Sequence, residues 1–204
     1  MPVTGRVSAI VFDRDGVLNE LCYFPGSRLA DSPTSPSQVR LVDGAGLAVR
    51  RVNNAGVPCF IASNQPGIAK RKMSASLLSK TTRRLLELLE SEDAVVDGIS
   101  YCLHHPDSAV PGLRALCPDR KPAPGMLLRI SSRLGVDPKQ CWMIGDSGVD
   151  ILAAQRAGFS SVRVRSFDCE TSVSDLDVVP DLVAPDPLAA VTMILGGTNV
   201  SISR

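Results

Sequence analysis

An apolar run that ends abruptly in two acidic residues constrains the fold of this chain more than any other feature. Residues 7–12 read VSAIVF, and the chain continues DRDG over 13–16. A short continuous run rich in Val, Ile and Phe predicts a strand that is buried on both faces of a sheet. Asp13 and Asp15 would repel each other, and burying them is costly unless a cation neutralises them. Mg²⁺ prefers oxygen ligands, so the turn suggests a magnesium site, although D-x-D-G alone also fits an ordinary acidic turn.

Strands alternate with helices along the rest of the chain. The patterns predict strands at 57–62, 98–102, 140–144 and 161–164, helices at 43–55, 74–90, 124–134, 147–157 and 186–195, and one more short apolar run at 178–183. This order predicts an α/β fold in three layers, with a mainly parallel central sheet that helices cover on both faces. Asp43 is expected to cap its helix. The length of 204 residues favours a single domain over 1–204.

Polar residues follow three of the predicted strands. Asp13 and Asp15 follow the first strand, Ser63 and Asn64 follow the second, and Asp146 follows the strand over 140–144. Ligands of open α/β sheets gather beyond the C-terminal ends of the strands, so these side chains are expected to meet. Taken alone, Ser63 fits a Ser/Thr turn and Asp146 fits a helix N-cap. Together they are suited to hold a phosphate group and its metal ion.

The motifs resemble those of the haloacid-dehalogenase-like (HAD) phosphohydrolases. The matching strings are FDRDGVLN at 12–19, Ser63 after the second strand, RKPAPGM at 120–126 and IGDSGVD at 144–150. The resemblance implies a three-layer Rossmann-like HAD fold of the small, capless branch. It also implies a phosphatase whose reaction passes through an aspartyl-phosphate.

The resemblance also assigns roles to single residues. Asp13 would be the nucleophile, and Asp15 would be the general acid and base. Ser63 and Lys121 would stabilise the transferring phosphoryl group. Mg²⁺ would be held by the Asp13 carboxylate, the Asp15 backbone carbonyl and the carboxylate of Asp146.

Three further polar residues lie beside these motifs. Asn64 is a candidate for a weaker substrate contact. Arg120 is a candidate for binding a second phosphate or another anionic group in bidentate fashion. Asp150 lies one helical turn after Asp146, where it would support either the metal shell or a backbone turn.

A Cys/His pattern between 102 and 121 suggests a structural zinc loop. It resembles the C-x-H…C-x-C-R-K-P loop of D-glycero-D-manno-heptose-1,7-bisphosphate phosphatases and histidinol-phosphate phosphatases. Cys102, His104 and Cys117 match the first three ligand positions, and Asp119 stands where the fourth Cys is usual. His105 is another candidate ligand, and a metal-free loop held by its own packing is the alternative. Zinc would act indirectly, by fixing the segment that carries Arg120 and Lys121.

The resemblance implies a Mg²⁺-dependent phosphatase of a small phosphorylated sugar. Its best candidate reaction converts heptose 1,7-bisphosphate to heptose 1-phosphate. Histidinol-phosphate phosphatase is the alternative within the same class. A phospho-accepting receiver or a scaffold is the alternative from another class, and Asp15 argues against the receiver.

The segment 20–42 is rich in Pro and Ser and reads as a long loop. Because it leaves the acidic turn directly, it is interpreted as an insertion that covers the site. Tyr23, Phe24 and Arg28 are candidates for substrate contact, and a solvated insertion without substrate contact is the alternative.

Composition excludes several classes of function. A formal net charge of +1 and 4% aromatic residues offer no surface for nucleic acid. We expect no membrane span, because no apolar stretch reaches the roughly 20 residues that a span requires. We expect no signal peptide, a cytoplasmic location, and a monomer or small homo-oligomer. The six Cys lack a compact disulfide spacing, so they fill the core or bind metal.

Overall fold

The computed structural model describes residues 6–24, 30–165 and 178–196. Six strands form one sheet: β1 (Ala9–Phe12), β2 (Cys59–Asn64), β3 (Gly98–Cys102), β4 (Cys141–Gly145), β5 (Ser160–Val164) and β6 (Leu182–Ala184). The strand order is β3-β2-β1-β4-β5-β6, and every neighbouring pair is parallel. The predicted α/β class and the mainly parallel sheet are therefore confirmed.

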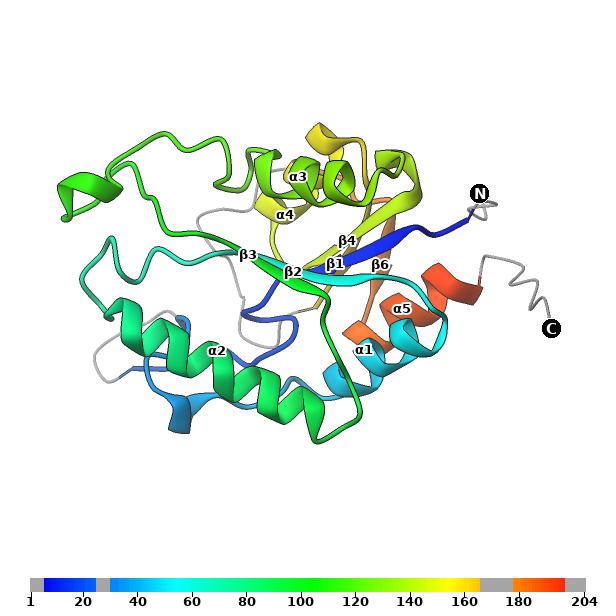
Figure 1. Ribbon diagram of the computed structural model, residues 1–204, viewed down its shortest axis with the longest axis horizontal. Helices are drawn as coiled ribbons and strands as arrows, with labels where there is room; N and C mark the ends of the chain where they lie inside the picture. Colours follow the sequence, from blue (N-terminus) through cyan, green and yellow to red (C-terminus); the bar gives the residue numbers. More distant parts are fainter. Residues whose placement is uncertain (1–5, 25–29, 166–177, 197–204) are drawn as a thin grey trace.

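Helices cover both faces of the sheet (Figure 1). The helices are α1 (Ala45–Asn54), α2 (Ala75–Glu90), α3 (Gly125–Leu134), α4 (Gly148–Ala157) and α5 (Pro187–Gly196). In Figure 1, α3 and α4 lie above the sheet, and α1, α2 and α5 lie below it. The three predicted layers are thus present, and none of the described helices is long and apolar enough to cross a bilayer.

The alternation of side chains along β1 divides the core between the two layers. Ile10 and Phe12 pack into the cluster beneath α1, α2 and α5, whereas Ala9 and Val11 pack into the cluster beneath α3 and α4. All four side chains are fully buried. A strand that is buried on both faces has no place for a charged residue, so Asp13 and Asp15 appear only where β1 ends.

The start of α1 differs from the sequence-based expectation. Gly44, not Asp43, is the N-cap, and it adopts a left-handed conformation with φ of +77°. No side chain caps this helix. The positive φ that turns the chain into α1 favours glycine, which explains why the boundary falls one residue after the Asp.

The segment 20–42 is more regular than a solvated loop. Its two arms pair through Cys22 and Asp31, whose backbone groups exchange hydrogen bonds of 2.8 and 2.9 Å. A 3₁₀ turn, Pro36–Gln38, precedes the return to the sheet. The base of this segment is therefore held beside the end of β1, and Arg28 lies outside the described residues.

Candidate active site

Asp13, Lys121 and Asp150 meet in a buried ion-pair cluster at the C-terminal end of the sheet. The Lys121 Nζ atom lies 2.9 Å from Asp13 Oδ1 and 2.5 Å from Asp150 Oδ1. Nζ also donates a hydrogen bond of 2.9 Å to the carbonyl of Ala62 in β2. The side chain of Lys121 is 1% exposed, so these contacts act with little solvent screening. The structure thus places Lys121 of the RKPAPGM string beside Asp13 of the FDRDGVLN string.

Three carboxylates gather around this single ammonium group. Oxygen atoms of Asp13, Asp146 and Asp150 all lie within 4.8 Å of one another. Burial raises the pKa of Asp13 to about 6, and the charge of Asp150 adds to this against the opposing effect of Lys121. Burial, with the charges of Asp150 and Asp13, raises the pKa of Asp146 well above its usual range. The ionised cluster carries an excess of two negative charges, because one lysine faces three carboxylates.

This donor set fits a divalent cation. Oδ1 of Asp13 and Oδ1 of Asp150 are buried and accept no well-aligned hydrogen bond from the described residues, although both are ion-paired with Lys121. Hard cations such as Mg²⁺ bind carboxylate oxygens of this kind. A bound divalent ion would balance the charge excess that now raises the pKa values of Asp13 and Asp146. The third carboxylate, Asp150, was predicted only as a possible support.

Asp150 also fixes the start of α4. Its Oδ2 accepts hydrogen bonds from the backbone N–H of Ser147 at 3.1 Å and from the Ser147 hydroxyl at 2.5 Å. These contacts form a capping box at the N-terminus of the helix. The fully buried side chain of Asp150 thus has the backbone role that was weighed for it, and its support of the metal shell stays a prediction.

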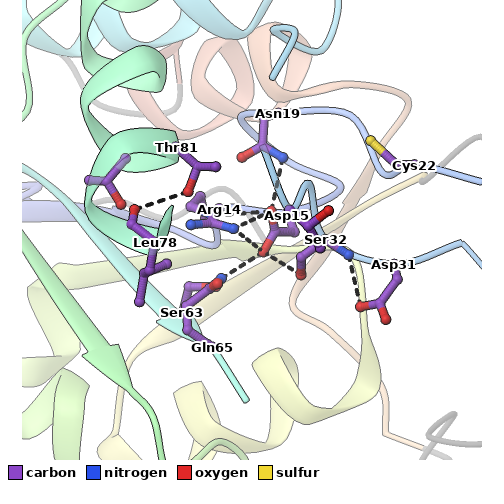
Figure 2. Close-up of polar contacts among 12 residues, drawn as sticks. Arg14, Asp15, Asn19, Cys22, Asp31, Ser32, Ser63, Gln65, Leu78 and Thr81 are labelled. Carbon is purple, nitrogen blue, oxygen red and sulfur yellow. Dashed lines mark hydrogen bonds and ion pairs between the residues drawn. The ribbon is translucent and has the colours of Figure 1, made fainter. Parts of the chain in front are cut away.

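Asp15 lies at the centre of a cage of hydrogen-bond donors (Figure 2). Arg14 contacts both of its carboxylate oxygens, through Nε at 3.0 Å and Nη2 at 2.9 and 3.0 Å. Asn19, Ser32 and Gln65 donate at 2.9, 2.9 and 2.6 Å. Although burial would raise the pKa of Asp15, Arg14 and the hydrogen bonds outweigh it and lower that pKa. The cage therefore fixes the position of the side chain and its ionised form.

Arg14 was not singled out by the sequence analysis. Its side chain is 2% exposed, and its guanidinium carbon lies 5.5 Å from the centre of the Tyr101 ring. The position of Arg14 between two motif aspartates does not predict its contact with Tyr101, because Tyr101 lies far away in the sequence, in β3. Burial of so large a cation is tolerated because Asp15 pairs with it and the aromatic face attracts it.

Ser63 and Gln65 lie where β2 ends, next to this cage. Ser63 is 2% exposed, and hydrogen bonding by Ser63 offsets a small part of the rise that burial causes in the pKa of Asp13. The Gln65 amide nitrogen donates to Asp15 Oδ2 at 2.6 Å and to Ser63 Oγ at 3.1 Å. Gln65 was also missed by the sequence analysis, because a buried Gln has no periodicity or motif that marks it.

Asn64 joins the end of β2 to the segment that carries Lys121. Its side-chain amide donates to the Lys121 carbonyl at 2.9 Å and accepts from the Lys121 backbone N–H at 3.0 Å. The substrate contact predicted for Asn64 stays a prediction, but the amide already has a structural function. Arg120 donates through Nη1 to the carbonyl of His104 at 3.1 Å, which links it to the Cys/His segment.

The Cys/His segment brings together three of its four predicted ligands. Ligand atoms of Cys102, His104 and Cys117 lie within 4.8 Å of one another, and Asp119 is not in this group. The Asp119 carboxylate is instead ion-paired with Arg129 of α3. Two thiols and one imidazole fit zinc by their chemistry, but structural zinc sites have four protein ligands. The fit is therefore incomplete at the position where Asp replaces Cys.

The insertion 20–42 contacts the site through residues other than those predicted. Ser32 donates to Asp15, and Asp31 is ion-paired with Lys72. Tyr23 lines a cavity of about 650 Å³ together with Gly16 of the acidic turn and residues at the starts of α1 and α5. The substrate contact predicted for Tyr23 and Phe24 stays a prediction. The prediction that the insertion lies over the site is supported by Ser32.

The fold and this arrangement of Asp, Ser and Lys at the strand ends define a hydrolase of the HAD-like class. The HAD-hydrolase-like family model matches residues 119–190, which include Lys121 and Asp146. That match covers the second half of the site, and β1 and β2 supply the first half.

Full-length relatives define the family within this class. The chain is 32% identical over 171 residues to the D-glycero-beta-D-manno-heptose-1,7-bisphosphate 7-phosphatase of Rhodopseudomonas palustris, covering 84% of this chain and 91% of the relative. It is 33% identical over 158 residues to the Escherichia coli K12 enzyme of the same name, covering 74% of this chain and 75% of the relative. The chain belongs to this family of HAD-like phosphatases.

A solved structure supports the same placement. The D,D-heptose 1,7-bisphosphate phosphatase of B. bronchiseptica, complexed with magnesium and phosphate, aligns with a TM-score of 0.77 and 28% identity. The alignment covers 93% of this chain and 98% of that chain. The two chains therefore share one fold over nearly the whole of their aligned length.

Proposed function

We propose that this chain is a Mg²⁺-dependent phosphatase that hydrolyses the C7 phosphate of heptose 1,7-bisphosphate and releases heptose 1-phosphate. The observation that carries the proposal is the meeting of Asp13 and Asp146, which follow β1 and β4, with Lys121 from the segment before α3. The two relatives described above bear the name of this activity, which supports the choice of sugar.

Asp13 is the proposed nucleophile. Phosphate monoesters resist attack because their oxygens are already negative, so attack requires positive charge around the phosphoryl group. Lys121, 2.9 Å from Asp13, supplies one such charge, and Ser63 offers a hydroxyl to a phosphoryl oxygen. Attack by the Asp13 carboxylate on phosphorus forms an aspartyl-phosphate and expels the sugar alkoxide.

Asp15 is the proposed general acid and base. Since the cage holds Asp15 ionised, the carboxylate first takes up a proton as a cage donor leaves it, and this proton then passes to the departing sugar oxygen. The resulting carboxylate then takes a proton from the water that attacks the aspartyl-phosphate, which releases inorganic phosphate and restores Asp13. Both carboxylate oxygens of Asp15 already accept hydrogen bonds from the cage. At least one of these donors must therefore be displaced when the leaving oxygen approaches.

Mg²⁺ would be held by the carboxylates of Asp13 and Asp146, with the backbone carbonyl of Asp15. When bound, it neutralises the phosphoryl charge and orients the phosphate group. Arg120 is proposed to bind the second phosphate of the sugar. The described cysteines are all free thiols, which supports a reducing compartment such as the cytoplasm.

A substrate comparison tests this function. Phosphate release is measured with Mg²⁺ for heptose 1,7-bisphosphate and for histidinol phosphate. We expect the higher kcat/KM for the heptose bisphosphate and no turnover after Mg²⁺ is chelated. A higher kcat/KM for histidinol phosphate would overturn the choice of sugar and leave the reaction class intact.

A further inference from the structure

Gln65 connects two side chains that have separate roles in the proposed reaction. Its amide nitrogen donates one hydrogen bond to Asp15 Oδ2 at 2.6 Å and another to Ser63 Oγ at 3.1 Å. Its side chain is 1% exposed, so water does not compete for these bonds. Among the described donors to Asp15, Gln65 alone also bonds to Ser63. Figure 2 shows the amide reaching from the end of β2 toward the Asp15 cage.

The orientation of the Gln65 amide follows from its neighbours. The opposite orientation would place the amide oxygen against a carboxylate oxygen of Asp15, and two acceptors at this distance repel each other. The amide nitrogen therefore uses its two protons on Asp15 and Ser63. Because Ser63 Oγ accepts from Gln65, the Ser63 hydroxyl proton is left to donate to another acceptor.

The backbone of Gln65 is fixed as firmly as its side chain. Its N–H donates to the carbonyl of Cys102 at 2.7 Å, which continues the β2–β3 pairing beyond the last strand residue. A side chain on so rigid a base can place Asp15 and Ser63 with little freedom, and such accuracy is what preorganised sites require.

We propose that Gln65 is a positioning residue that aligns the general acid Asp15 with the phosphoryl-binding hydroxyl of Ser63. The inference rests on the proposed roles of those two residues. Through these two bonds, Gln65 holds the acid at the side of the phosphoryl group where the sugar oxygen departs. Loss of the amide removes this alignment while the nucleophile and its lysine keep their contacts.

Leaving groups of different basicity test this role. An alkyl phosphate needs a proton on its departing oxygen, whereas 4-nitrophenyl phosphate releases a stable phenolate without one. The variant Gln65→Met keeps the size of the side chain and removes both donors. The control variant is Gln155→Met, because Gln155 is an exposed residue of α4 whose amide bonds only a backbone carbonyl among the described contacts.

The expected result is a selective loss. For the best alkyl phosphate of the wild-type enzyme, kcat/KM of Gln65→Met falls about 10- to 100-fold, whereas for 4-nitrophenyl phosphate it changes less than about threefold. This ratio reports the steps up to departure of the leaving group and not the later hydrolysis of the aspartyl-phosphate, which both substrates share. The variant Asp15→Asn sets the benchmark, with the same selectivity and a larger loss. The Tm of each variant is measured to show that it is folded.

Two outcomes overturn the inference. One is an equal loss on both substrates, which assigns Gln65 a structural role only. The other is no loss on the alkyl phosphate. If Asp15→Asn itself fails to discriminate between the substrates, the acid role in the proposed function fails, and the alignment role of Gln65 fails with it. If Asp15→Asn discriminates between the substrates and Gln65→Met does not, only the Gln65 inference fails.

Discussion

At the scale of single residues, the site is governed by an imbalance of charge. Asp13, Asp146 and Asp150 share one ammonium group, Lys121, at the end of the sheet. Desolvated like charges are tolerated only with a counter-charge, so these three carboxylates favour the binding of a further cation. Asp15 is neutralised separately by Arg14, which leaves it out of this imbalance.

The nucleophile role predicts a large kinetic loss without loss of fold. We expect Asp13→Asn to lower kcat by at least about 1,000-fold, because an amide cannot form the aspartyl-phosphate. The exposed Asp43, which is neutralised in the same way in Asp43→Asn, serves as the control. Phosphate release and circular dichroism are measured for both variants, and substantial turnover by folded Asp13→Asn refutes the nucleophile role.

The raised pKa of Asp13 predicts how stability depends on pH. The pKa rises from 3.8 to about 6 on folding, so the folded chain retains a proton that the unfolded chain releases. This lowers the free energy of unfolding as the pH rises between these two pKa values. The raised pKa of Asp146 acts in the same direction. The lowered pKa of Asp15 acts in the opposite sense but only at more acidic pH.

Mg²⁺ should relieve this loss of stability. A metal ion binds the ionised carboxylates and not the protonated ones, so it competes with the proton. We expect the rise in Tm on adding Mg²⁺ to be larger at about pH 7.5 than at about pH 5. Differential scanning fluorimetry measures both shifts, with Asp13→Asn as the control in which the rise should shrink. Equal shifts at the two pH values would contradict the magnesium assignment.

At the scale of elements, the position of Lys121 depends on two neighbours. Asn64 binds the backbone of Lys121 from the end of β2, and Arg120 binds the carbonyl of His104 in the Cys/His segment. Lys121 is therefore held from both sides even though it lies in an irregular segment. A zinc ion in the Cys/His segment would strengthen one of these two attachments.

The Asp at the fourth ligand position predicts a weak zinc site. Restoring the thiolate in Asp119→Cys should raise zinc affinity at least about tenfold, because thiolate-rich four-ligand sites are the stable ones. Asp119→Asn should leave affinity unchanged, since the Asp119 carboxylate pairs with Arg129 and stands outside the ligand group. Chelator competition and metal content measure both variants. Unchanged zinc content in Asp119→Cys argues against a zinc site, and loss of zinc in Asp119→Asn makes Asp119 a ligand.

At the scale of the whole molecule, the parallel sheet brings the site residues together. Asp13 after β1, Ser63 in β2 and Asp146 after β4 lie 50 to 133 positions apart in the chain, yet parallel pairing places the C-terminal ends of these strands side by side. Ligand sites of open α/β sheets form at this edge for the same reason. The strand topology therefore determines where the site forms, and the local sequence determines which side chains lie there.

The sequence predicted the parts of the molecule that local patterns encode. Apolar runs located the strands, and polar residues directly after them located Asp13, Ser63 and Asp146. Contacts between distant segments were not predictable in this way. Gln65 and Ser32 reach Asp15 only because β2 and the 20–42 insertion return to it in space, and no periodicity marks such a meeting.

A crystal structure with Mg²⁺ and beryllium trifluoride tests the central claim most directly, because this reagent mimics a phosphoryl group bound to a carboxylate. The account predicts beryllium bonded to an Asp13 oxygen, Mg²⁺ between Asp13, the Asp15 carbonyl and Asp146, and Lys121 and Ser63 on the fluorides. Beryllium trifluoride on another residue, or Mg²⁺ bound away from Asp13 and Asp146, would contradict it.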